Sequence, residues 1–220
     1  YDSVRMVDLV ASDEIDVTPE ALALAEGPLR AELSQYSWPM EPKSAKPKTG
    51  GVRFLRRILE LGGARGSAAA LDAAAERLWS SHLEKNLMSR VLEGVVPALD
   101  GLALAQVRLA VVSNAEGTVE AMLREQGLRS YFGAVCDSWV VGFAKPDPRI
   151  FSAALDALAV QPDDAIMVGD SPNADVSGAR GAGMVGVLID PFGLHADHDA
   201  DRFPTFAAFA EAVLQLPPKY

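Results

Sequence analysis

Two aspartates stand five residues apart where an apolar run gives way to a predicted helix. In residues 167–184, MVGDSPNADVSGARGAGM, the run ends at Gly169, which permits a tight turn, and Asp170 and Asp175 follow. Hard carboxylate oxygens so arranged suit Mg²⁺, which binds through one or two carboxylates together with waters and substrate phosphate. Either aspartate alone could instead complement a helix N-terminus. The metal interpretation therefore depends on what the neighbouring strand ends carry.

Two other strand ends carry polar groups that suit an anion. The run LAVVSN ends in Ser113 and Asn114, where a hydroxyl and the backbone N–H groups of a turn can hold a phosphate oxygen. The same pair also caps helices for purely structural reasons. Lys145 follows a strand and precedes a helix that Asp147 can cap, with Pro148 at its first position. An ammonium held there could lie over a phosphate or a charged intermediate, whereas a lone surface lysine would have no such role.

The elements that must position these side chains alternate between strand and helix after Gly94. Strands are predicted at 107–114, 134–141, 165–170 and 185–190, and helices at 118–127, 148–158, 174–183 and 203–216. This alternation predicts βαβ units and a parallel sheet with helices on both faces, an α/β fold. Because ligands collect at the carboxyl ends of such strands, we expect Ser113, Lys145 and Asp170 to meet at one edge.

Before Gly94 the apolar residues recur at helical spacing. Helices are predicted over Val4–Val10, after the capping signal Thr18-Pro19, and over 51–61 and 67–91. The Pro-, Lys- and Gly-rich stretch 38–51 indicates an exposed linker, although its lysines could also attract an anionic substrate. We therefore expect two domains, a helical one at 1–93 and an α/β one at 94–220.

Composition narrows the classes of partner. The 220 residues include 30 Asp and Glu against 20 Lys and Arg, for a formal net charge of −10. This excess argues against nucleic acid or an anionic membrane as the main partner. No run reaches the roughly 18 apolar residues of a membrane span, and a single cysteine, Cys136, fits a reducing cytoplasm. Cys136 and His82 are interpreted as packing residues, and the segment from His195 to Asp201 as a solvated acidic loop.

In chain order, the motifs Ser113-Asn114, Lys145-Pro146 and Gly169-Asp170 with Asp175 resemble those of the haloacid dehalogenase superfamily, in its phosphatase-like branch with an inserted helical cap. The resemblance covers nearly the whole chain and implies a cap at 1–93 and a Rossmann-like core at 94–220. It implies that Ser113 and the backbone of Asn114 bind phosphoryl oxygens and that Lys145 neutralises nucleophile and substrate. It also implies that Asp170 binds Mg²⁺ and that Asp175 supports the metal directly or through water.

The function implied by the resemblance is Mg²⁺-dependent hydrolysis of a small phosphorylated metabolite through an aspartyl-phosphate intermediate. One alternative is a non-catalytic relative that keeps the phosphate cradle. Another is dehalogenation, although metal-free dehalogenases of this superfamily do not need the carboxylate of Asp170. Phosphonate cleavage and phosphosugar mutation are also carried by this scaffold. The sequence selects neither a substrate nor an oligomeric state.

The nucleophile expected from the resemblance is missing from the sequence pattern. Family members begin with a strand ending in Asp-x-Asp, whose first Asp attacks phosphorus and whose second acts as general acid and base. The nearest candidates, Asp8, Asp13 and Asp16, lack this spacing and follow no apolar strand. They are interpreted as the charged end of a helix.

The position of that first strand argues that it exists. In the family it lies at the centre of the sheet, between the strand that ends at Ser113 and the strand that ends at Asp170. Its loss would leave buried backbone groups unpaired, at a cost of about 1–3 kcal/mol for each group. We therefore expect a further N-terminal segment to carry this strand and its Asp-x-Asp.

Overall fold

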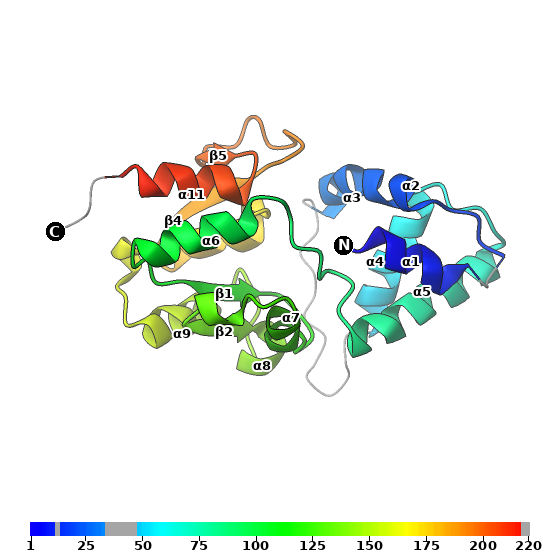
Figure 1. Cartoon of the computed structure of the whole chain (residues 1–220), viewed down its shortest axis with the longest axis horizontal. Coiled ribbons are helices and arrows are strands. Elements are labelled where there is room, and N and C mark those ends of the chain that lie inside the picture. Colours follow the sequence, from blue (N-terminus) through cyan, green and yellow to red (C-terminus); the bar gives the residue numbers. More distant parts are fainter. Residues whose placement is uncertain (12–13, 34–47, 217–220) are drawn as a thin grey trace. The chain divides into compact units, whose positions relative to one another are not determined.

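A computed structural model describes residues 1–11, 14–33 and 48–216. The chain divides into two units, Tyr1–Arg90 and Val91–Tyr220 (Figure 1). Each unit has buried apolar clusters of its own. The candidate site residues lie in the second unit, and the first is helical in its described part.

The first unit is built from amphipathic helices around one apolar core. Its helices are α1 Ser3–Val10, α2 Pro19–Leu24, α3 Glu26–Leu33, α4 Lys48–Leu61 and α5 Ala68–Glu84. Met6, Leu22, Ile58 and Leu78 are fully buried in this core. Each comes from a different helix, so burial of the apolar stripes holds the helices together.

The helix start predicted at Thr18-Pro19 is confirmed, but one predicted helix end is wrong. Thr18 Oγ1 accepts a hydrogen bond from the Ala21 N–H at 3.2 Å, and Pro19 is the first residue of α2. By contrast, α5 ends at Glu84 and does not reach residue 91. The His82 ring is responsible in part, because its Nδ1 accepts a hydrogen bond from the Leu87 N–H beyond the helix at 3.2 Å.

His82 is a packing residue, as predicted. It is buried and stacks on Trp79 with ring centroids 5.3 Å apart. The linker predicted at 38–51 lies largely outside the described residues, and its last part, from Lys48, opens α4.

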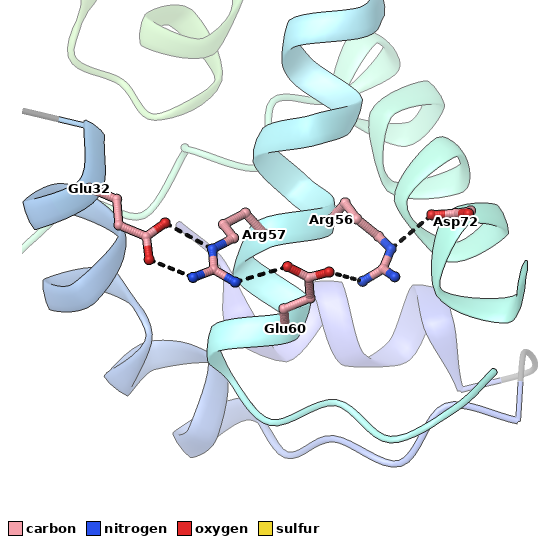
Figure 2. A network of polar contacts seen from close by, with 5 residues as sticks. All are labelled: Glu32, Arg56, Arg57, Glu60 and Asp72. Atoms are coloured by element: carbon pink, nitrogen blue, oxygen red, sulfur yellow. Dashed lines mark hydrogen bonds and ion pairs between the residues drawn. The ribbon is translucent and has the colours of Figure 1, made fainter. Parts of the chain in front are cut away.

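A network of ion pairs crosses α3, α4 and α5 on the surface of the first unit (Figure 2). Arg57 binds Glu32 through Nη2 at 2.5 Å and Nε at 2.8 Å, and Glu60 at 3.0 Å. Glu60 also binds Arg56 at 2.7 Å, and Arg56 reaches Asp72 at 2.8 Å. Because these side chains are partly exposed to solvent, between 20% and 71%, the network adds little to the stability supplied by the core.

The second unit alternates strands and helices. Its strands are β1 Ala110–Ser113, β2 Ala134–Asp137, β3 Ile166–Gly169, β4 Val185–Ile189 and β5 Arg202–Phe203. Its α-helices are α6 Val95–Leu104, α7 Val119–Glu125, α8 Ser138–Val141, α9 Pro148–Leu158, α10 Gly178–Gly181 and α11 Phe206–Leu214. Short 3-10 turns lie at Arg129–Tyr131 (η1) and Pro162–Asp164 (η2), and a π-helical turn at Pro172–Ser177 (η3) precedes α10.

The strands form two parallel sheets where the sequence predicts one. β1 pairs with β2, so that Ser113 lies opposite Asp137, and β3, β4 and β5 pair in that order. Within the described residues no ladder joins β1 to β3. Both strands therefore present an edge whose backbone groups are not used in a ladder. The α/β class and the parallel pairing are confirmed.

Helices of the second unit pack against its strands and against each other. α9 lies against β1 and β2, and α6 runs beside α11 (Figure 1). Ile150 and Phe151 of α9 are fully buried and cluster with Cys136 of β2, which is buried as predicted. The helix containing Gly178 approaches Phe151 so closely that a Cβ there would lie 2.8 Å from the ring.

Several predicted boundaries in this unit are wrong; the strand predicted from residue 107 begins at Ala110, and the helix predicted from residue 203 begins at Phe206. The predicted strand 134–141 stops at Asp137, because the Asp137 side chain accepts the Trp139 N–H and starts α8. The predicted helix 174–183 begins at Pro172 with a π-helical turn. No helix in the described part of the chain has the length and apolar character needed to cross a membrane.

Candidate functional site

Lys145 links the ends of two strands that belong to different sheets. Its ammonium donates to the carbonyl of Val112 in β1 at 2.8 Å and lies 2.6 Å from Asp175 Oδ1, in the turn after β3. The Lys145 and Asp175 side chains are 12% and 3% exposed. An ion pair this far from solvent is screened little, so it fixes the ammonium between the two strand ends.

Asn114 fixes the backbone of the same lysine. Its side-chain Nδ2 donates to the Lys145 carbonyl at 2.9 Å, and its Oδ1 accepts the Lys145 N–H at 2.7 Å. The amide thus pairs with the main chain as a neighbouring strand would. Ser113, the last residue of β1, is therefore joined through Asn114 to the loop that carries Lys145.

Asp175 is held from two sides. Its Oδ2 accepts the Ser171 N–H at 2.9 Å. Its Oδ1 is close enough to Lys145 for an ion pair, but among the described residues it accepts no hydrogen bond of good geometry. The contact with Lys145 is therefore an electrostatic attraction.

Gly169 provides the space in which the Asp175 carboxylate lies. A Cβ at position 169 would lie 2.3 Å from both Cγ and Oδ2 of Asp175 and 2.8 Å from its Cβ. The sequence predicted a glycine that permits a tight turn, but Gly169 has no positive φ. The structure requires glycine here because another side chain approaches the backbone.

The two predicted metal ligands have different environments. Asp170 is exposed where the chain leaves β3, whereas Asp175 is buried with both oxygens engaged. In the described part of the chain, no three or more His, Cys, Asp or Glu residues gather as a ready metal cage. Mg²⁺ does not need such a cage, because waters and substrate phosphate complete its shell. The donor set is therefore compatible with Mg²⁺.

Sequence reasoning missed Asp137 and Ser138, which hold the loop after Ser113. Asp137 is 2% exposed, and its oxygens accept the N–H of Gly117 at 2.9 and 3.0 Å and of Val119 at 3.4 Å. Ser138 Oγ accepts the Ala115 N–H at 3.0 Å and donates to the Ala115 carbonyl at 3.1 Å. Burial raises the pKa of Asp137, although these backbone donors oppose the rise. The only sequence signal was an Asp-Ser pair that interrupts an apolar run.

The acidic loop after β4 is organised by hydrogen bonds to its own backbone. Asp190 accepts the N–H groups of Leu194 at 2.8 Å and His195 at 2.9 Å. His198 Nδ1 accepts the Ala200 N–H at 3.1 Å. No metal cluster is found in this loop or elsewhere in the described residues.

The three aspartates near the start of the chain stand apart from these groups along the sequence. Asp8 lies in α1, Asp16 forms an isolated bridge with Arg65, and Asp13 lies outside the described residues. None of the three follows a described strand, so no Asp-x-Asp strand end is found among them.

Comparisons with known proteins all point to the same family. Residues 8–183 match the family described as haloacid dehalogenase-like hydrolase. The chain is 32% identical to a phosphoglycolate phosphatase of Nitrosospira multiformis, over 88% of this chain and 85% of that protein. It is also 38% identical to haloacid dehalogenase-like hydrolase domain-containing protein 3 of Bos taurus, over 56% of this chain. It spans about half (48%) of that relative's length.

A solved structure supports the fold. The hydrolase YfnB of Bacillus subtilis, crystallised bound to magnesium, superposes with a TM-score of 0.65 at 18% identity, over 98% of this chain and 92% of that one. At this identity the likeness concerns the fold alone. The family match over most of the chain, together with the Nitrosospira relative, decides the question of membership. The chain belongs to the haloacid dehalogenase-like hydrolase family.

Proposed function

We propose that this protein is a Mg²⁺-dependent phosphatase that acts on a small phosphomonoester. The observation that carries the proposal is the placement of Lys145, whose ammonium lies 2.8 Å from the Val112 carbonyl and 2.6 Å from Asp175. A buried cation held between two strand ends suits a substrate whose reacting group is an anion. The Nitrosospira relative, named a phosphoglycolate phosphatase, supports the same class of substrate.

Each site residue has one role in this proposal. The Ser113 hydroxyl and the Asn114 backbone bind phosphoryl oxygens at the end of β1. Lys145 offsets the charge of the phosphate and of the attacking group, and its position is kept by Asn114 and Asp175. Asp170 binds Mg²⁺, and Asp175 supports the site. The metal supplies charge stabilisation for the transferring phosphoryl group.

The attacking carboxylate belongs, in this proposal, to a strand that lies between β1 and β3. Both strands carry an edge that forms no ladder within the described residues, and both run parallel to their partners. A parallel strand ending in Asp-x-Asp would complete one sheet and bring its carboxylates beside Lys145. The first Asp would take up the phosphoryl group, and the second would transfer the proton.

Residues 1–93 act in the same proposal as the cap that selects the substrate.

The first experiment measures hydrolysis of p-nitrophenyl phosphate by the full-length protein, with Mg²⁺ and with a chelator. We expect turnover that requires the metal and falls at least about a hundredfold in Asp170→Asn, because the metal ligand is lost. The matched control is Asp163→Asn, which changes an exposed aspartate in η2, outside the site. No turnover by the verified full-length protein, combined with tight phosphate binding, would favour a non-catalytic phosphate-binding relative.

A further inference from the structure

The loop that follows Ser113 is held by side chains from a different strand. Asp137 ends β2, lies opposite Ser113 in the parallel ladder, and accepts the N–H groups of Gly117 and Val119. The next residue, Ser138, binds both the N–H and the carbonyl of Ala115. Together, Asp137 and Ser138 form hydrogen bonds to alternate residues of the loop from 115 to 119.

These contacts exceed what a helix cap requires. Asp137 does cap its own helix, by accepting the Trp139 N–H at 3.0 Å. Its remaining contacts reach a loop some twenty residues earlier, at the start of α7. There the Thr118 side chain forms no capping hydrogen bond for α7, so the Asp137 carboxylate serves the first N–H groups of both helices.

The turn itself depends on this arrangement. Gly117 has a φ of +86°, and a Cβ there would lie 3.0 Å from Cδ1 of the Trp139 ring. The loop thus packs against the first residues of α8 while its N–H groups bind Asp137 and Ser138. The direction in which the chain leaves Ser113 is therefore set by β2 as well as by β1.

We propose that Asp137 and Ser138 are positioning residues that set the affinity of the Ser113-Asn114 loop for the substrate's phosphoryl group. The inference rests on the proposed function, because it assumes that this loop binds phosphate. A loop whose backbone is already ordered loses less conformational entropy when an anion binds. Neither residue needs to touch the substrate.

The test compares phosphate binding in two matched variants of the full-length protein. In Asp137→Asn an NH2 group replaces one carboxylate oxygen. A donor then faces backbone N–H groups whose hydrogen bonds the carboxylate accepted. Asp190→Asn is the control, since Asp190 is also buried and also accepts N–H groups of the loop after its strand. Ser138→Ala is a milder variant that leaves the carboxylate in place, in case Asp137→Asn fails to fold.

Binding of inorganic phosphate in the presence of Mg²⁺ is measured by calorimetry, beside amide hydrogen exchange and the Tm of each protein. We expect Asp137→Asn to weaken phosphate binding about tenfold and Ser138→Ala about threefold. We expect faster amide exchange at Gly117 in Asp137→Asn and at Ala115 in Ser138→Ala, because each variant loses the acceptor of that N–H. Asp190→Asn should bind phosphate with an affinity within about twofold of the wild type, even if its Tm falls as much as that of Asp137→Asn.

Three outcomes would count against the inference in distinguishable ways. If the wild type binds phosphate and Asp137→Asn binds it equally well, the positioning role is wrong and the proposed function stands. If both Asp variants lose affinity in proportion to their Tm, the effect is general destabilisation. If the wild type shows neither phosphate binding nor hydrolysis, the proposed function fails and this inference fails with it.

Discussion

Replacement of Gly169 by alanine tests how tightly Asp175 is held. The new methyl carbon would lie 2.3 Å from Cγ and Oδ2 of Asp175, far inside van der Waals contact. It would also lie 2.8 Å from the Asp175 Cβ, so rotation of the carboxylate alone is not enough. The Asp175 side chain must therefore move, and it loses its contacts with Lys145 and Ser171.

The expected loss of stability follows from those two contacts. Breaking a buried ion pair by removing one partner costs about 3–5 kcal/mol, because the other charge is left uncompensated. A hydrogen bond from a backbone N–H to a carboxylate contributes about 1.5–3 kcal/mol. The two losses overlap, because one displacement breaks both and the displaced groups gain water, so we expect a total of about 3–5 kcal/mol.

Urea denaturation followed by far-ultraviolet circular dichroism measures this loss. Gly181→Ala is the matched control, because Gly181 lies in α10 without a positive φ and has open space around its missing Cβ. We expect that control to change stability by less than about 1 kcal/mol. A Gly169→Ala protein within about 0.5 kcal/mol of the wild type would refute the close packing of Asp175 against residue 169.

Further predictions concern a tether, a thiol and an ion-pair network. Asn114→Ala removes both hydrogen bonds to the Lys145 backbone, so kcat for p-nitrophenyl phosphate should fall about tenfold or more. An unchanged kcat would show that these two hydrogen bonds are not needed to position Lys145. Cys136 is buried, and burial raises the pKa of its thiol, so Ellman's reagent should react at least about a hundredfold faster in denaturant than with the native protein. Arg57→Met should lower Tm by only about 1–2 °C, and high salt should abolish the difference, because the Arg57 partners are largely solvated; a larger, salt-insensitive loss would contradict this.

The features that the sequence predicts well are those set by neighbouring residues. Asp147 and Pro148 start α9 where expected, because a cap and a ring-restricted φ act within one turn. The ends of β1 and β3 are also predicted, since an apolar run stopped by polar residues marks the edge of a buried strand. These local signals were enough to place Ser113 and Asp170 at strand ends.

The features missed from the sequence depend on contacts between distant residues. β5 consists only of Arg202 and Phe203, which pair with β4. Two residues are too few to form an apolar pattern that predicts a strand. α6 was missed although Pro97 falls in its first turn, where a proline is tolerated. The role of Asp137 depends on Gly117, twenty residues away. The spacing of apolar residues along the sequence does not predict a contact between residues so far apart.

The site shows why a few strand-end motifs suffice to recognise this family while leaving its geometry unknown. Lys145 reaches its position through Asn114 on one sheet and Asp175 beside the other, so its placement depends on both sheets at once. Gly169 matters for the same reason, because only its missing side chain lets Asp175 come within reach of the ammonium. A change in either sheet should therefore disturb the lysine before it unfolds the protein. Loss of activity is then a more sensitive measure of the site than loss of stability.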